Sequence, residues 1–322
     1  MPGNTDYNTL FSTTLKNYRK TLADNIFKHN FVFNYMFEKG RTDMQSGGYS
    51  IIQPIMYGES TAKGWYSGYD SLDTTPQEGI TAAEYKWKQA FATITISGEE
   101  ERKNNGEQAL INLLKAKIQQ AEKSLESQFA KALFAEGSGD EMNGLKHFMQ
   151  DDPTGSEEIG GINQSTNTWW RNYTYQCTRS SADYDTIVAD MMKLYNRTRD
   201  GSDHIDLIVT DITTFEEFEK ALTTTVRFHP GMTDTKLAEV GFDNYKVKGA
   251  TLSWDEECEA EKAYGINTDY LNFVVHPDAN FTNTPFVTPE NQDARTAKIL
   301  WMGNLTCSNR KRQGKLYRTS GS

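Results

Sequence analysis

The longest periodic stretch of the sequence, residues 98 to 136, predicts one long helix. Apolar side chains recur every three or four residues along it and form a single stripe. They are Leu110, Leu114, Ile118, Ala121, Leu125, Phe129 and Leu133. Three glutamates open the stretch, where the helix dipole favours negative charge, and Gly137 and Gly139 follow its end. At ~1.5 Å per residue the helix spans about 40 Å, which is long for an ordinary globular domain.

Residues 47 to 97 change to a strand-like pattern and predict a long hairpin. Its first strand covers residues 49 to 57, and Pro54 restricts that strand to an edge or a two-stranded ribbon, because proline cannot donate to a central ladder. Its second strand covers residues 85 to 96. The turn-rich tip between them carries Trp65, Tyr66 and Tyr69. A pair with so few apolar residues is marginal alone, so we expect it to lie on something else.

The N-terminal part predicts an amphipathic helix over residues 5 to 28, followed by a dense aromatic run. The run holds Phe31, Phe33, Tyr35 and Phe37, and Gly40 ends it. It is consistent with a core strand or with an arm that buries its rings against a neighbouring subunit. The sequence leaves both interpretations open.

Residues 183 to 275 predict an α/β region. We expect a helix near 184–198 and a second helix around Phe215 and Phe218, with Thr213 or Thr214 as its N-cap. The expected strands cover residues 205–210, 245–252 and 270–275, and further strands follow in the tail from 281 to 318. No internal repeat or low-complexity linker divides these segments, which indicates one interlocked chain.

Composition excludes several classes of protein. Hydrophobic residues make up 37% of the 322 residues and aromatic residues 12%, which is enough to build a sizeable core. No run of ~18 apolar residues occurs, and the first 22 residues lack the pattern of a signal peptide, so we expect neither a membrane span nor secretion. The net charge of −10 makes the chain a poor general wrapper of nucleic acid. Its three cysteines are far apart and odd in number, which favours buried thiols in a reducing compartment.

A search for catalytic motifs finds none. The five histidines are isolated, and no metal-binding or phosphate-loop spacing is present. The pair Asp203 and His204 precedes a strand and is better explained as a polar turn than as half of a metal site. Runs of carboxylates such as residues 99–101 and 255–257 are typical of solvated faces. The sequence therefore predicts no catalytic residue, no metal and no cofactor.

One basic cluster lies near the C-terminus. It consists of Arg310, Lys311, Arg312, Lys315 and Arg318. The simpler interpretation is a solvated terminal strand or tail. The alternative is an electrostatic contact with DNA or with an acidic neighbouring subunit.

The order of these elements resembles the major capsid protein of tailed bacteriophages, which has the shell fold named after phage Hong Kong ninety-seven. An arm, a long hairpin, a very long helix, an α/β lobe and closing strands follow one another along nearly the whole chain. Three local phrases also resemble phage capsid sequences. They are residues 64–70, residues 143–145 together with 160–163, and residues 169–172. Each phrase is weak by itself, and their joint order makes the match specific.

The resemblance implies an α+β fold with five parts. These are an N-terminal arm (1–45), an extended loop (46–98), a peripheral domain (99–185) with its spine helix (99–136), an α/β axial domain (186–275) and return strands of the peripheral domain (276–322). It also implies candidate contacts between subunits, with packing inside the same chain as the alternative. The candidates are Phe31, Phe33, Tyr35, Phe37, Trp65, Tyr66, Tyr69, Tyr85 and Trp87.

The function implied by the resemblance is structural and not enzymatic. Such a chain assembles with itself into hexamers and pentamers of an icosahedral head, in the host cytoplasm, and encloses double-stranded DNA in the virion. A separate scaffolding protein and a portal are the expected partners, and no membrane is involved. The sequence leaves open whether a decoration protein binds the outside. Some relatives cross-link a lysine of the loop to an asparagine of a neighbour. Lys63 lies near the predicted loop tip, but no residue here is assigned as its partner, so this chemistry is not carried over.

Two other functions stay open from the sequence. The first is an encapsulin-type compartment shell that encloses a cargo enzyme, which co-purified cargo would favour. The second is an intracellular α/β enzyme with an unrecognised site, which a compact monomer or dimer with a deep polar pocket would favour.

Overall fold

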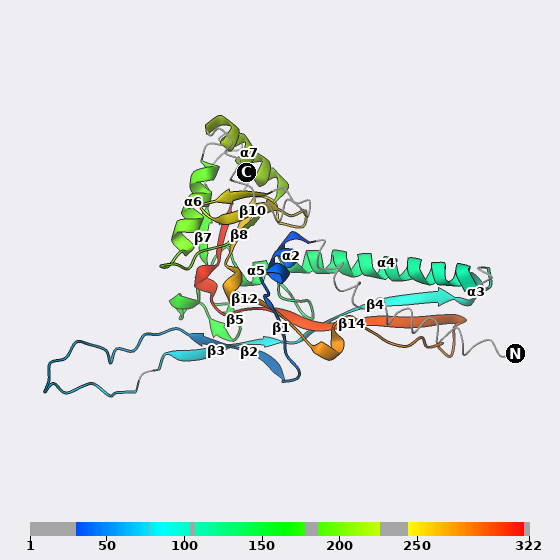
Figure 1. Cartoon of the computed structure of the whole chain (residues 1–322), viewed down its shortest axis with the longest axis horizontal. Helices are drawn as coiled ribbons and strands as arrows, with labels where there is room; N and C mark the ends of the chain where they lie inside the picture. The colour runs from blue at the N-terminus through cyan, green and yellow to red at the C-terminus, as the bar shows by residue number, and fades with distance from the viewer. Residues whose placement is uncertain (1–29, 77, 104–106, 178–185, 226–243, 319–322) are drawn as a thin grey trace.

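The computed structural model describes residues 30–76, 78–103, 107–177, 186–225 and 244–318, and the predicted helix over residues 5–28 lies outside them. Two larger sheets, one long helix and one projecting ribbon form the molecule (Figure 1). The short elements that connect them are α5 (Leu145–Phe148), β5 (Glu158–Ile159), β6 (Ile162–Asn163), and the 3-10 turns η1 (Thr168–Trp170), η2 (Thr268–Tyr270), η3 (Pro277–Ala279) and η4 (Arg310–Arg312).

The first sheet is organised around β14 (Ala294–Cys307), its longest strand. On one edge β14 pairs antiparallel with β4 (Lys88–Ser97), from Ala294 opposite Ser97 to Gly303 opposite Lys88. On its other edge it pairs with β13 (Thr282–Asn283) and with β12 (Leu271–Val275). The short strand β1 (Thr42–Met44) completes the sheet by pairing parallel with β12.

Helix α4 (Glu107–Phe134) lies along this sheet, as Figure 1 shows. The predicted apolar stripe faces the core from Leu114 to Leu133, and Phe129 packs edge-on against Trp301 of β14. Leu110 also belongs to the predicted stripe, but its side chain is not among those that the structure describes. The stretch before α4 is also helical, as α3 (Gly98–Lys103), and residues 104–106 between the two lie outside the described residues. Ser97 caps α3 by accepting from the backbone N–H of Glu100.

The aromatic run forms a helix, α2 (Phe31–Glu38), and not a strand. Asn30 begins it, because its side-chain oxygen accepts from the backbone N–H of Val32 and of Phe33. The first six residues of α2 are all buried, as expected for a helix that is covered on every side. Phe33 contacts Phe273 of the first sheet, while the Tyr35 hydroxyl donates to the carbonyl of Asp206 beside the second sheet. Helix α2 thus joins the two halves of the chain.

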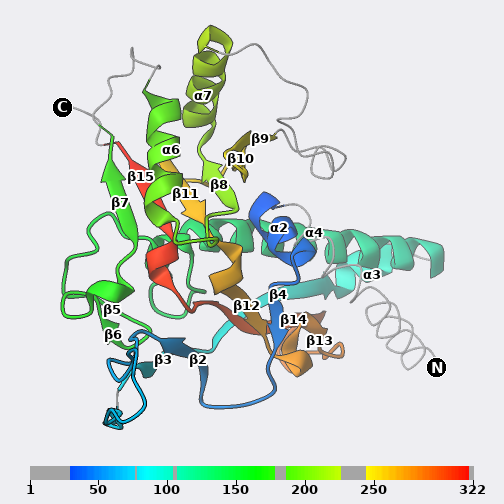
Figure 2. The same cartoon turned by 60° about the vertical axis from the view of Figure 1, so that its left-hand side comes forward.

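The second sheet contains six strands in the order β7 (Tyr173–Gln176), β15 (Gly314–Tyr317), β11 (Lys262–Ile266), β8 (Leu207–Thr210), β10 (Ala250–Trp254) and β9 (Asn244–Val247). Helices α6 (Ile187–Thr198) and α7 (Ile212–Thr225) pack against it (Figure 2). Alternate residues of β8 enter two different cores. Leu207 and Val209 join the core of the first sheet, and Ile208 joins the core beneath α6 and α7.

Three sequence-based expectations for this region are wrong in detail. Residues 245–252 form two strands, because the chain reverses at Lys248 and Gly249, which both have positive φ. Asp211, and neither threonine, begins α7, since its carboxylate accepts from the Thr214 N–H. The expected boundary at residue 275 also does not separate the sheets. Strand β12 belongs to the first sheet, while β15 from the tail belongs to the second.

The projecting ribbon consists of β2 (Ser50–Met56) and β3 (Ile80–Lys86), with Ser50 opposite Lys86 and Met56 opposite Ile80. It has two strands, as the position of Pro54 predicted. Its second strand is β3, whereas most of the predicted second strand forms β4 of the first sheet. Trp87 lies between β3 and β4, where the chain passes from the ribbon into the sheet.

Arg310 is fully buried where the two sheets and the ribbon meet. Its guanidinium donates to the carbonyls of Phe148 and Trp170 and to the side-chain oxygens of Gln164 and Asn172, at 2.8 to 3.1 Å. All four acceptors are neutral. Burial therefore lowers the pKa of Arg310 to about 10, although the group stays charged at neutral pH.

The Arg310 bonds lead to a first prediction. Arg310→Met should lower the free energy of unfolding by about 2–4 kcal/mol, because it leaves several buried acceptors without a donor. Urea unfolding of Arg310→Met beside Lys311→Met measures this, since Lys311 is the exposed neighbour and its loss should change stability by less than about 0.5 kcal/mol. Equal stability of the two variants would contradict the structural role of Arg310.

A second prediction concerns Asp255, which ties α2 to the second sheet. Its carboxylate accepts from the Asn30 side chain at 2.9 Å and from the backbone N–H of Glu257 at 3.1 Å. Burial raises the pKa of Asp255 from its ordinary 3.8 to about 6. The raised pKa means that the folded chain binds this proton more tightly than the unfolded chain. The resulting stabilisation is complete below pH 3.8 and is lost as the pH rises through 6.

We therefore expect the parent, but not Asp255→Asn, to lose this stabilisation between pH 4 and pH 7. Over that range the unfolding free energy of the variant should rise by about 2–3 kcal/mol relative to that of the parent. Denaturant titrations across this range measure the shift. Glu256→Gln is the control, because Glu256 is exposed beside Asp255 and its replacement should leave most of the pH dependence in place. A constant difference between Asp255→Asn and the parent would show that Asp255 does not titrate in this range.

Candidate assembly site

The segment between β2 and β3 extends away from the body of the molecule (Figures 1 and 2). Every described residue from Glu59 to Glu78 is exposed except Ala62, which is half-buried. Trp65 and Tyr69 are as exposed as free side chains, at 105% and 106%, and Tyr66 is 67% exposed. Large aromatic side chains normally bury most of their area in a folded protein. The three exposed rings therefore make this segment an uncovered apolar surface.

Hydrogen bonds within this segment are local. Ser67 N–H donates to Asp70, Thr75 donates to Asp73, and Lys63 pairs with Glu59. Among the described residues, these bonds shape the segment without fixing it to the body. Its two ends meet at the top of the ribbon, where the N–H groups of Tyr57 and Gly58 both donate to the carbonyl of Gly79.

The base of the ribbon is fixed to the body. The Tyr85 hydroxyl donates to the carbonyl of Cys307 at 2.7 Å, and the Glu84 N–H donates to the carbonyl of Gly160 at 3.0 Å. Gly160 has a φ of +62°, and a Cβ there would lie 2.8 Å from the Cβ of Ala83. The sequence needs glycine at this position because the ribbon lies directly on the turn between β5 and β6.

The nine aromatic candidates fall into three groups. Trp65, Tyr66 and Tyr69 are free to contact another molecule. The expected contact with a neighbouring subunit is wrong for Phe31, Phe33, Tyr35 and Tyr85, because the core of the same chain buries these rings. Phe37 and Trp87 are half-buried, with Phe37 beside Phe273 and the Trp87 indole donating to the carbonyl of Gly48.

The ribbon also exposes aliphatic residues that the sequence interpretation missed. Ile52, Met56 and Ile80 are 61%, 79% and 74% exposed, and Leu72 lies beyond them in the projecting segment. Period-two alternation in β2 carried this signal, since Ile51 and Ile55 are buried while Ile52 and Met56 are not. One face of the ribbon therefore packs against the body of the same chain, and the opposite face is apolar and exposed.

The C-terminal basic cluster does not form an exposed basic patch. Arg310 and Lys315 are fully buried, so the alternative that these two residues contact DNA is wrong. Arg312 pairs with Asp200, and Arg318 pairs with Glu217 and Glu261. Lys311 alone of the five is exposed. Four of these cations are thus engaged by their own chain.

Lys315 belongs to an ionic cluster at the junction of the two halves. Its Nζ lies 2.7 Å from Asp151, and Lys262 bridges Asp151 and Glu259 at 3.3 and 2.7 Å. Burial acts to raise the pKa of Glu259, but hydrogen bonds from Lys146 and Lys262 outweigh it and lower the pKa to about 2. The carboxylate is therefore charged at any physiological pH, which suits a structural role better than proton transfer.

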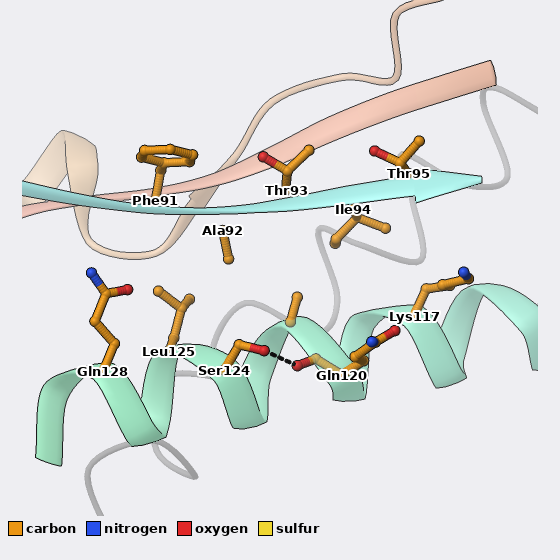
Figure 3. Close-up of a pocket in the computed structure, with 11 residues that line it drawn as sticks. Phe91, Ala92, Thr93, Ile94, Thr95, Lys117, Gln120, Ser124, Leu125 and Gln128 are labelled. Carbon is orange, nitrogen blue, oxygen red and sulfur yellow. Dashed lines mark hydrogen bonds between the residues drawn. The ribbon is translucent and has the colours of Figure 1, made fainter. Parts of the chain in front are cut away.

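The described cavities lie between α4 and β4 and have volumes of about 340 and 400 Å³. In the first of them, Ala92 and Ile94 point toward the helix, while Phe91, Thr93 and Thr95 point away from it (Figure 3). Gln120, Ser124 and Gln128 of the helix form its polar side, and the Ser124 hydroxyl donates to the carbonyl of Gln120. The side chains lining this cavity offer hydrogen bonds, and Lys117 is the one charged residue among them.

All three cysteines are buried, as predicted. Burial raises the pKa of the Cys307 thiol to about 12, so it carries almost no thiolate at neutral pH. Within the described residues, no three histidine, cysteine or carboxylate side chains are placed to share a metal ion. The same residues include no helix that combines the length and apolar character needed to cross a bilayer.

Comparison with solved structures identifies the fold. The capsid asymmetric unit of cyanophage A-1(L) aligns with 86% of this chain and 90% of its own chain, at 16% identity and a TM-score of 0.64. The capsid of the native GTA particle aligns with 88% of this chain and 90% of its own, at 11% identity and a TM-score of 0.58. The SrpI encapsulin of Synechococcus elongatus PCC 7942 aligns with 89% and 91%, at 9% identity and a TM-score of 0.53.

No protein-family model matches the sequence, and the curated proteins contain no match to it. The likeness is therefore one of fold and covers nearly the whole chain on both sides. The predicted α+β shell architecture is confirmed: the chain has the fold of the Hong Kong ninety-seven-like phage capsid proteins.

Proposed function

We propose that this chain is the major capsid protein of a tailed phage, which assembles with itself into the hexamers and pentamers of an icosahedral head that encloses double-stranded DNA. One observation carries the proposal. The segment from residue 58 to 79 presents aromatic side chains that the described part of the chain leaves exposed, on a fold found in capsid shells. A neighbouring copy supplies the missing cover.

The energetics of this segment favour contact between copies. Burial of one large apolar side chain contributes roughly 1.5–3 kcal/mol, and aromatic anchors often dominate interfaces. Trp65, Tyr66 and Tyr69 therefore supply several kcal/mol per contact. A loop of one copy on the body of the next is a heterologous contact, and repeated rotation by such contacts closes rings.

We assign the parts of the fold accordingly. Residues 46–98 contain the extended loop, and the first sheet with α4 forms the peripheral domain. The second sheet with α6 and α7 forms the axial domain around the five-fold and six-fold axes. Strand β12 of the peripheral domain and strand β15 of the axial domain connect the two domains along the chain. In our proposal the two domains therefore move as one unit.

The proposed partners follow from this role. A separate scaffolding protein and a portal guide assembly in the host cytoplasm, the outside of the shell is open to a decoration protein, and the mature shell is part of the virion. The chain carries no catalytic step in this proposal. The acidic net charge suits a container that holds DNA without binding its sequence.

The encapsulin likeness supports a second candidate, a compartment shell around a cargo enzyme. The two functions share assembly and differ in content. Electron microscopy of the purified chain, expressed alone and with its neighbouring genes, separates them. Closed particles or rings of hexamers support a shell, and their content distinguishes DNA from cargo protein. A uniform small particle under every condition would contradict both and favour the enzyme alternative.

Replacement of residues 58–78 by Asn-Gly tests the loop directly. Tyr57 and Gly79 lie side by side, so a two-residue turn can close the ribbon without disturbing β2 or β3. We expect a folded subunit of unchanged thermal stability that forms no closed shells. The matched control, Trp65→Ala with Tyr69→Ala, keeps the loop length and should lower the yield of shells. Normal shells from the shortened chain would contradict the assembly role of the loop.

A further inference from the structure

A pair of stacked rings joins the outer end of the ribbon to the body. Tyr57, the residue after β2, lies flat on Trp169 with ring centroids 4.8 Å apart and an angle of 16° between the planes. Beyond Tyr57, the described hydrogen bonds of the projecting segment remain within the segment and with Tyr57 itself. The stack therefore lies at the point where the segment leaves the body.

Trp169 is itself held in a fixed position. It belongs to the turn η1, whose next residue, Trp170, donates from its indole to the carbonyl of Ile159 at 2.9 Å. The Trp170 carbonyl accepts from the buried Arg310, whose guanidinium also lies over the Trp170 ring. A rigid chain of contacts thus runs from the Arg310 network to Trp169, and through the stacked rings to Tyr57.

The backbone at this point does not fix the direction of the segment by itself. Tyr57 and Gly58 share one acceptor, the carbonyl of Gly79, and Gly58 and Gly79 both lack a Cβ. Because glycine restricts the backbone less than any other residue, this pair holds the strand ends less firmly than two residues with side chains would. An aromatic stack contributes about 0.5–1.5 kcal/mol beyond the area that it buries, which is enough to bias such a joint toward one angle.

We propose that the Tyr57–Trp169 stack is a positioning contact that sets the angle at which residues 58–79 leave the body, and thereby the curvature of the assembled shell. The link to curvature rests on the proposed function. A loop that contacts the next copy fixes the rotation between copies, so a small change of its angle is repeated at every contact. Closed shells need one narrow range of rotation, whereas other rotations produce tubes or open sheets.

The first test measures the angle within single chains. Nitroxide labels at Ser67→Cys in the projecting segment and Lys123→Cys on α4 occupy exposed positions, while the native thiols are buried. Pulsed electron spin resonance below the concentration at which particles form gives their distance distribution. We expect Trp169→Ala to broaden the distribution and shift its mean. Trp169→Phe should restore a narrow one, and Trp65→Ala should leave it unchanged.

Tyr57→Ala provides the same test from the other ring, in case Trp169→Ala reduces folding. Tyr57 is 38% exposed, so its truncation removes the stack with little loss of core. A distribution as narrow as that of the parent in both variants would overturn the proposal. Equal melting temperatures with a broadened distribution would support positioning over a purely structural role.

The second test measures the shells. Trp169→Ala and Tyr57→Ala should give particles of altered or mixed diameter, with tubes, at a yield close to that of the parent. Trp65→Ala should instead reduce yield and keep the diameter. Uniform shells of parental diameter from both stack variants would overturn the link to curvature. If the parent itself forms no particles, the proposed function fails, and the distance measurement still decides whether the stack positions the segment.

Discussion

The buried guanidinium of Arg310 connects segments that are far apart in the sequence. It bonds to Phe148 at the end of α5, to Gln164 after β6, and to Trp170 and Asn172 around η1. These segments form the platform on which the β2–β3 ribbon rests, and they border both sheets. A planar group with five fixed donors can hold four acceptors in one arrangement, whereas a lysine has only three donors, which rotate about one nitrogen. The energetic cost of burying a charge is met here by four neutral acceptors, so the platform keeps its shape only while the arginine is in place.

The ribbon shows how a chain can fold well and still remain incomplete. Its inner face, with Ile51, Ile55 and Tyr85, is buried as deeply as any core. Its outer face and its tip leave apolar side chains in water. A monomer gains nothing from such exposure, which also carries a risk of aggregation. The exposed set becomes favourable only when another surface covers it, which is what the proposed contact between copies supplies.

Much of the architecture could be predicted from local patterns. The apolar stripe of α4 and the proline in β2 each constrain the backbone directly, and the order of elements indicated the shell fold. Prediction failed where three-dimensional context outweighs composition. The aromatic run around Phe33 resembles a strand, but the Asn30 cap and burial on every side make it a helix. The charges of Arg310 and Lys315 indicate a solvated tail, yet distant carbonyls and carboxylates draw both into the interior. Exposed aromatics at the loop tip were predictable because nothing nearby in the sequence could cover them, whereas the stack on Trp169 depends on a contact across more than a hundred residues.

The positions of β14 and β15 constrain when the chain can mature during synthesis. Strand β14 lies between β4 and its partners β12 and β13, and β15 lies between β7 and β11. Both strands follow residue 293, so each sheet has a gap at an internal position until this part of the chain has been synthesised. Contacts of such long sequence separation also form slowly. In the proposed assembly, a nascent chain therefore has no finished surface to offer to other copies before β14 and β15 have been inserted.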